Sequence, residues 1–176
     1  MKRNLQHVPY GYEPPKEEVK GTLIYYDTFE DTRETDLNKA LEVFDNLSFK
    51  KLVLYPLHEE TVKRMSKESV SAFYKREKPL LAWEKEVSRS NVIIESWEGK
   101  RKKYTPIDTA LRHLAEKYPA PHFVYMTPEM ANAFASFSSF EEWMVKLRLI
   151  LAAKPNQPHP RLEKFSHRWD TVEELE

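Results

Sequence analysis

Four short apolar runs recur along this chain, and each is followed by a stretch with helical periodicity. The runs are Thr22–Tyr26, Leu52–Tyr55, Val92–Ile94 and Phe123–Met126. Short apolar runs that alternate with amphipathic helices are typical of β-strands joined by crossover helices. Because such crossovers connect parallel neighbours, the alternation predicts an α/β domain with a mostly parallel sheet.

Helix and turn signals complete this pattern. Thr105-Pro106 and Thr127-Pro128 each combine an N-cap residue with proline at the first helical position. Residues 139–151 place apolar side chains on one helical face, so we expect a last long helix there. The predicted fold is a three-layer sandwich, flavodoxin-like or Rossmann-like, around a four-stranded sheet. Glu98-Gly99 is a turn signal that predicts an added antiparallel hairpin over residues 92–104.

Proline divides the chain into an arm, a body and a tail. A cluster of prolines near the start forbids regular structure, so we expect residues 1–20 to be an extended N-terminal arm. Residues 21–153 hold the alternating pattern and are expected to form a single α/β domain. Further prolines predict an extended C-terminal tail over residues 154–176.

The composition argues against several classes of function. The chain has three glycines and no cysteine. A backbone cradle for phosphate needs glycine, because the amides must approach the anion closely, so a dinucleotide-binding or P-loop motif cannot be written here. The absence of cysteine removes disulfides and thiolate metal sites. Lysine plus arginine equals aspartate plus glutamate, at 28 each, so no overall charge favours nucleic acid or an anionic membrane.

Carboxylates follow two of the predicted strands, at the edge where parallel α/β sheets bind ligands. Asp27 and Asp31 follow the first strand, and Glu95 follows the third. A strand order of 2-1-3-4 would bring these strand ends together. The three side chains are therefore candidate ligands of a divalent metal such as Mg²⁺, which prefers oxygen donors. A solvated acidic loop that favours the amino end of the next helix is the alternative.

Other polar and aromatic residues at the same strand ends are candidates for contacting a small molecule. These candidate ligand-binding residues are Thr28, Ser96, Trp97 and Thr127. Thr127 begins a predicted helix and would offer an amide and a hydroxyl to an anion.

A histidine follows the second predicted strand. His58 is adjacent to Glu59, and a carboxylate raises the basicity of a neighbouring imidazole that already titrates near neutral pH. The pair are therefore candidate catalytic residues, with His58 as the general acid or base. A loop histidine that packs on Tyr55 or is exposed is the alternative.

Two segments near His58 resemble the signatures of nucleotidylyl-transferring enzymes of the class I synthetase type. They are Pro56-Leu57-His58 and Arg64-Met65-Ser66-Lys67. That family carries a Gly-His pair after its first histidine, where this chain has Glu60-Thr61. The family's first signature also follows the first strand, whereas His58 follows the second. Its second signature lies in a distant loop, so no residue role is carried over.

The leading hypothesis is a domain that binds a small ligand at the strand ends, with metal-assisted hydrolysis or phosphoryl chemistry if it is an enzyme. The alternative is a non-catalytic interaction module. In that module the basic hairpin 97–104, with Lys100–Lys103 between Trp97 and Tyr104, binds RNA or an acidic protein surface. A charged hairpin edge that merely deters strand pairing would look the same.

Membrane insertion is not expected. No run approaches 18 apolar residues, and Met1-Lys2-Arg3 leads into a polar segment instead of an apolar signal sequence. With the absence of cysteine, this predicts a cytoplasmic protein. The balanced charge disfavours nucleic acid as a partner, and only the basic hairpin argues for it. A homo-oligomer in which the arm and tail wrap a neighbour is a further possibility.

Overall fold

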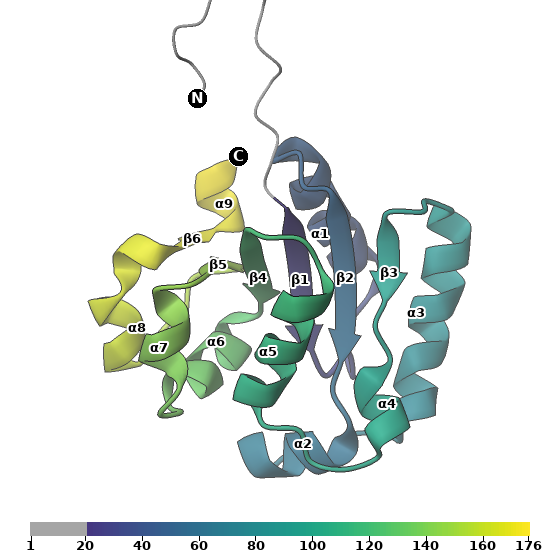
Figure 1. Ribbon diagram of the computed structural model, residues 1–176, viewed down its shortest axis with the longest axis horizontal. Coiled ribbons are helices and arrows are strands. Elements are labelled where there is room, and N and C mark those ends of the chain that lie inside the picture. The colour runs from purple at the N-terminus through teal and green to yellow at the C-terminus, as the bar shows by residue number, and fades with distance from the viewer. Residues whose placement is uncertain (1–20) are drawn as a thin grey trace, which may run out of the picture.

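The computed structural model describes residues 21–176, so the predicted arm over 1–20 lies outside the described residues. This part of the chain forms one parallel sheet of six strands in the order β3-β2-β1-β4-β5-β6, with helices on both faces (Figure 1). The strands are β1 (Thr22–Asp27), β2 (Lys51–Pro56), β3 (Val92–Ile94), β4 (His122–Met126), β5 (Arg148–Leu151) and β6 (Trp169–Thr171). The helices are α1 (Glu34–Asn46), α2 (Glu59–Met65), α3 (Phe73–Val87), α4 (Trp97–Arg101), α5 (Ile107–Lys117), α6 (Pro128–Ala135), α7 (Phe140–Met144), α8 (Pro160–Lys164) and α9 (Val172–Leu175), with a 3₁₀ turn η1 (Ser166–Arg168).

The central strands feed two hydrophobic cores, because successive side chains of a strand point to opposite faces of the sheet. Ile24 and Tyr26 of β1 share a core with α2, α5, α6, α7 and α8. Leu23 and Tyr25 share the other core with α1, α3 and α9. Figure 1 shows α5 on the near side of the sheet and α1 on the far side. Every residue of β1 is buried, as expected for a strand covered on both faces.

The predicted mostly parallel α/β sandwich is confirmed, and its strand order is the one found in Rossmann-like folds. The four apolar runs form β1 to β4. Helix α6 starts at Pro128 after the N-cap Thr127, as predicted. Helix α5 starts at Ile107, one residue later than predicted, with Pro106 in the N-cap position. The sheet in residues 21–176 has two strands more than the predicted four.

The predicted long helix over residues 139–151 is wrong. Helix α7 ends at Met144, and the chain then forms β5, in which Leu149 lies beside Val124 of β4. A short apolar run suits a buried helix and a buried strand equally well. Parallel pairing with β4 decides between them, and this depends on residues distant in sequence. Strand β6, which comes from the segment 154–176, extends the sheet beyond β5.

The predicted antiparallel hairpin over residues 92–104 is also wrong, because the chain forms helix α4 after β3. Glu98 of α4 is fully buried. Its carboxylate accepts hydrogen bonds from the Tyr55 hydroxyl at 2.7 Å, the His58 N–H at 2.8 Å and the Thr61 hydroxyl at 2.7 Å. A buried carboxylate needs such partners. They hold α4 against β2 and α2, so the segment cannot extend as a hairpin.

The order of the central strands differs from the predicted 2-1-3-4, because β2 lies between β1 and β3. Crossovers are right-handed, so the face that carries the helix determines the direction in which the chain moves across the sheet. Helices α1 and α3 share one face and carry the chain outward to β2 and β3. Helix α5 covers the other face and returns the chain to β4, beside β1. None of the helices in residues 21–176 is long and apolar enough to cross a membrane.

Candidate ligand-binding site

A cavity opens where the strand order reverses, at the carboxyl ends of β1 and β4. From β1 the chain continues to β2 and β3 on one side, and from β4 to β5 and β6 on the other. The crevice at such a reversal is the usual ligand site of an open α/β sheet. The volume of this β1–β4 cavity is about 580 Å³, within the roughly 300–1,000 Å³ typical of small-molecule sites.

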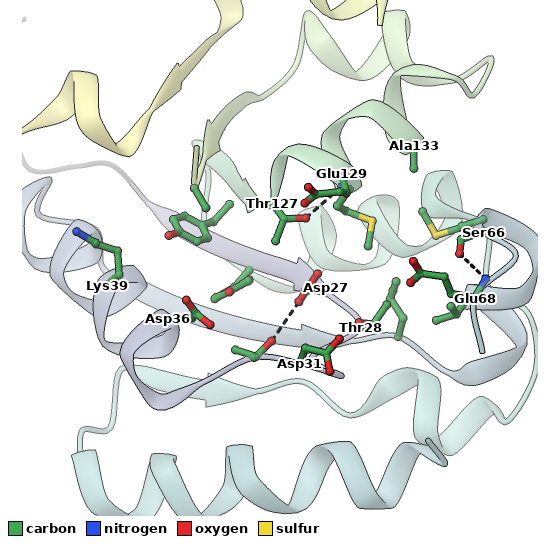
Figure 2. A pocket seen from close by; sticks show the side chains of 18 of the residues that line it. Asp27, Thr28, Asp31, Asp36, Lys39, Ser66, Glu68, Thr127, Glu129 and Ala133 are labelled. Carbon is green, nitrogen blue, oxygen red and sulfur yellow. Dashed lines mark hydrogen bonds between the residues drawn. The ribbon is translucent and has the colours of Figure 1, made fainter. Parts of the chain in front are cut away.

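Residues from several elements line the β1–β4 cavity (Figure 2). Its apolar lining consists of aromatic, aliphatic and methionine side chains with two alanines: Tyr25, Leu57, Val62, Met65, Tyr125, Met130, Ala133 and Ala152. Its polar lining is Asp27, Thr28, Asp31, Thr32, Thr35, Asp36, Lys39, Ser66, Glu68, Thr127 and Glu129. Four of the predicted site residues therefore line this cavity: Asp27, Thr28, Asp31 and Thr127.

Asp27 is the most deeply placed acid of the cavity. Its side chain ends β1, and the residue is only 8% exposed. Oδ2 accepts hydrogen bonds from the Phe29 N–H at 3.2 Å and the Thr32 hydroxyl at 3.3 Å. The backbone N–H of Thr28 also stabilises the charged carboxylate. Burial raises the pKa of Asp27 from 3.8 to about 6, although these hydrogen bonds oppose the change.

The loop after β1 turns sharply to make the bond to Oδ2. Phe29 has a φ of 61°, in the left-handed region that a bulky residue rarely adopts. Its ring is buried against Tyr25, with ring centroids 4.8 Å apart. This packing offsets the strain of the backbone. The turn thus fixes the carboxylate of Asp27 at the bottom of the cavity.

The lining of the cavity is strongly acidic. It contains five carboxylates, those of Asp27, Asp31, Asp36, Glu68 and Glu129, and one ammonium group. The ammonium belongs to Lys39, whose Nζ lies 3.4 Å from a carboxylate oxygen of Glu176. Figure 2 shows Asp27 in the middle, with Asp31 and Asp36 on one side and Glu129 on the other. The cavity therefore attracts positive charge and repels anions.

Thr127 and Thr28 line the cavity at neighbouring strand ends. The Thr127 hydroxyl accepts a hydrogen bond from the Met130 N–H at 3.1 Å and so caps α6. Its proton is still available to a ligand, because a hydroxyl can donate and accept at once. The carbonyl of Thr28 accepts a hydrogen bond from Arg76 at 2.8 Å. These interactions hold both threonines in place, and the hydroxyl of each can still contact a ligand.

Arg76 is a buried arginine that sequence reasoning missed. Its guanidinium donates to the carbonyls of Thr28, Leu57 and Ser71 at 2.8, 2.6 and 2.7 Å, and lies 3.3 Å from a carboxylate oxygen of Glu59. It therefore joins the loops that follow β1 and β2, and both loops border the cavity. Its place on the apolar stripe of α3, three residues after a buried phenylalanine and four before a buried leucine, is the sequence signal that could have identified it.

The predicted catalytic pair does not line the β1–β4 cavity. His58 caps α2, because its Nδ1 accepts the Glu60 N–H at 3.1 Å. Glu59 accepts the Phe73 N–H at 3.0 Å and a bond from Arg76 at 3.3 Å. The two side chains are adjacent, with His58 Nε2 at 3.6 Å from Glu59 Oε1. Both residues are therefore held by contacts with other protein groups and lie outside the cavity lining.

The structure separates the residues after β3 from Asp27, because β2 lies between the two strands. Glu95 pairs with Lys117 at 2.7 Å and accepts the Tyr118 hydroxyl at 2.7 Å. Burial opposes ionisation of Glu95, but these bonds hold its pKa below the ordinary value. Ser96 donates to Glu77, and Trp97 stacks on the imidazole of His113, with centroids 3.8 Å apart.

The structure does not assemble the metal site suggested by the sequence. Among residues 21–176 no three histidine, aspartate or glutamate side chains lie close enough to hold a metal ion. Asp27 and Asp31 line the cavity, but Glu95 does not. The predicted set of three carboxylates is therefore not brought together, and only Asp27 and Asp31 of that set share the cavity.

The basic cluster Lys100–Lys103 lies at the end of α4 instead of on a hairpin. The guanidinium of Arg101 lies over the ring of Trp97 at 4.9 Å, and its Nε donates to the Thr105 hydroxyl at 3.0 Å. In the same basic cluster, Lys102 and Lys103 follow α4, and both residues are exposed. The aromatic partner predicted for stacking bases is therefore already stacked on protein groups.

Comparison with known proteins supports the fold. No protein-family model and no curated protein sequence matches this chain. Among solved structures, the chain is similar to one described as a putative nicotinate-nucleotide adenylyltransferase from Vibrio parahaemolyticus. The TM-score is 0.52 with 15% sequence identity, over 84% of this chain and 86% of the other. At this identity the likeness shows a shared Rossmann-like α/β fold alone.

Proposed function

We propose that this protein binds a small molecule in the β1–β4 cavity. The observation that carries the proposal is the cavity itself, about 580 Å³ at the reversal of strand order. A mixed lining supports it, because small-molecule sites combine apolar walls with a few polar groups that orient the ligand. The cytoplasmic location and the homo-oligomer inferred from the sequence stay predictions.

The lining argues against a ligand held directly by its phosphate. A backbone cradle would need glycine after β1, where this chain has Thr28-Phe29-Glu30-Asp31. The carboxylates of Asp27 and Asp31 would repel the phosphate as well. The ligand is therefore recognised by its uncharged or positively charged groups.

Phosphoryl chemistry is a second candidate function. The similarity in fold to a structure described as a putative adenylyltransferase is the observation that favours it. In such a reaction the cavity would hold the part of the substrate that does not carry the phosphates. No reaction step is assigned to His58 or Glu59, since both have structural partners.

A thermal-shift screen with a pair of tryptophan variants tests the proposal. The screen covers amines, sugars, organic acids and nucleotides, each with and without Mg²⁺. Ala152 lines the cavity and the neighbouring Ala153 does not, and both residues are exposed. Ala152→Trp should fill part of the cavity, and Ala153→Trp is the matched control.

A ligand at 100 times its Kd adds about 2.7 kcal/mol to the stability of the wild type. For a chain of this size that corresponds to roughly 5 °C or more in Tm. We expect the same rise in Ala153→Trp and a much smaller one in Ala152→Trp. If no compound distinguishes the two variants, the β1–β4 cavity is not the binding site.

A further inference from the structure

The β1–β4 cavity combines an apolar wall, an excess of carboxylates and a deeply placed aspartate, Asp27. We propose that its ligand is an organic cation, namely a protonated amine or a guanidinium group on an apolar body, and that Asp27 contacts the charge. This inference rests on the proposed function and names the class of its ligand.

The position of Asp27 is the first argument. The residue is 8% exposed and lines the cavity. Both hydrogen bonds that it receives, from Phe29 and Thr32, end on Oδ2. A carboxylate that lines a cavity can accept a further hydrogen bond from a ligand, and a cationic donor gives the strongest one.

The charge of the lining is the second argument. Four more carboxylates surround Asp27, and Lys39 is the one basic side chain in the cavity lining. The ammonium of Lys39 is already paired with Glu176 at 3.4 Å. Asp36 is paired with Arg33, whose Nε lies 3.8 Å away, but the other carboxylates still leave the lining with an excess of negative charge. The lining therefore attracts a cationic ligand and repels an anionic one.

The apolar wall separates an organic cation from a metal ion. Tyr25, Leu57 and Tyr125 are each at most 3% exposed and line the cavity. The rings of Tyr25 and Tyr125 pack edge to face, with centroids 4.7 Å apart. These surfaces favour the hydrocarbon part of a ligand. No three metal-binding side chains come together in residues 21–176, and a bare ion would gain nothing from the apolar wall.

An NMR titration of the full chain with three compounds of similar shape tests the inference. The compounds are 2-phenylethylamine, 2-phenylethanol and phenylacetate, which are cationic, neutral and anionic at pH 7.5. Agmatine supplies the guanidinium group. We expect 2-phenylethylamine to bind at least about tenfold more tightly than 2-phenylethanol, a difference that corresponds to one strong charged interaction. Phenylacetate should not bind at the same concentrations.

Variants locate the charge preference. Asp27→Asn, which keeps the shape of the side chain, should weaken amine binding about tenfold or more and leave 2-phenylethanol unchanged. Asp31→Asn, at an exposed residue, should weaken amine binding by a smaller factor. Glu163→Gln removes an exposed carboxylate outside the cavity lining and should change nothing.

The outcomes separate this inference from the proposed function. If all three phenyl compounds bind equally and Ala152→Trp removes their binding, the cation inference is overturned and the small-molecule function stands. If the amine still binds to both Asp27→Asn and Ala152→Trp, its site lies outside the β1–β4 cavity, and the cation inference is overturned. If neither the amine nor agmatine binds at 10 mM, the cation inference is also overturned. If no compound of the whole metabolite screen binds, both proposals are refuted.

Discussion

Replacing Asp27 with asparagine should make the protein more stable at neutral and alkaline pH, although it removes a group that we expect to bind the ligand. The folded protein holds the pKa of Asp27 at about 6, because the carboxylate is buried. In the unfolded chain the same group titrates near its ordinary value of 3.8. Above pH 6 the folded state must therefore carry a buried charge that the unfolded state carries in water.

The expected magnitude follows from that difference. Each unit of pKa corresponds to about 1.4 kcal/mol, so ionised Asp27 makes the folded state about 3 kcal/mol less stable than an unperturbed aspartate would. Asparagine removes the charge and can still accept from the Phe29 N–H and the Thr32 hydroxyl. Those bonds become weaker without the charge, by about 1 kcal/mol. We therefore expect Asp27→Asn to raise the free energy of unfolding by about 1–3 kcal/mol at pH 8.

The gain should depend on pH in a defined direction. Between about pH 4 and pH 6 the folded protein keeps the proton on Asp27 while the unfolded chain releases it, so the wild type loses stability from this group as the pH rises. The advantage of Asp27→Asn should be largest above pH 6 and should shrink toward zero near pH 4. Urea unfolding of both proteins from pH 4 to pH 8 measures it, with Glu163→Gln as the exposed control. Equal stability of Asp27→Asn and wild type at pH 8 would refute the reasoning.

Three further substitutions test a buried ion pair, a close packing contact and a helix cap. Arg76→Met should lower the free energy of unfolding in urea by about 3–5 kcal/mol, because it leaves buried carbonyls and a carboxylate unpaired; an equal loss in Arg89→Met, at a partly exposed ion pair, would contradict this. Gly99→Ala should cost about 1–3 kcal/mol, since its Cβ would lie 2.4 Å from the Phe73 ring, and Phe73→Leu should restore much of the loss in Tm. Thr127→Ala should cost about 1 kcal/mol by removing the cap of α6, whereas Thr127→Ser should keep it.

Local signals in the sequence predicted the elements that depend on neighbouring residues. The apolar runs that become β1 and β2 are buried on both faces, and such runs are recognisable without knowledge of the fold. Thr127-Pro128 predicted the start of α6, because capping and the fixed φ of proline act within one turn. Arg148–Leu151 was misread as helix, since only pairing with β4 distinguishes the two states.

The candidate site was predictable only in part. Asp27, Thr28 and Thr127 come directly after strands, and the ends of adjacent parallel strands share one edge of the sheet, so their gathering follows from the fold class. Glu95 was grouped with them on an assumed strand order. The observed order places β2 between β1 and β3, and Glu95 instead pairs with Lys117.

The sequence by itself determined that this protein is a parallel α/β domain with acids after its first strand, because the periodicity of buried side chains and the chemistry of helix starts act over a few residues. Only the tertiary structure decided which strand ends meet and which polar groups find partners. The same type of side chain can therefore have a structural role in one place and line a ligand cavity in another. Glu98 is buried with three donors from other elements, whereas Asp27 accepts hydrogen bonds from its own loop and lines a cavity. That difference depends on contacts between residues far apart in the chain, and it is what makes the β1–β4 cavity the candidate site.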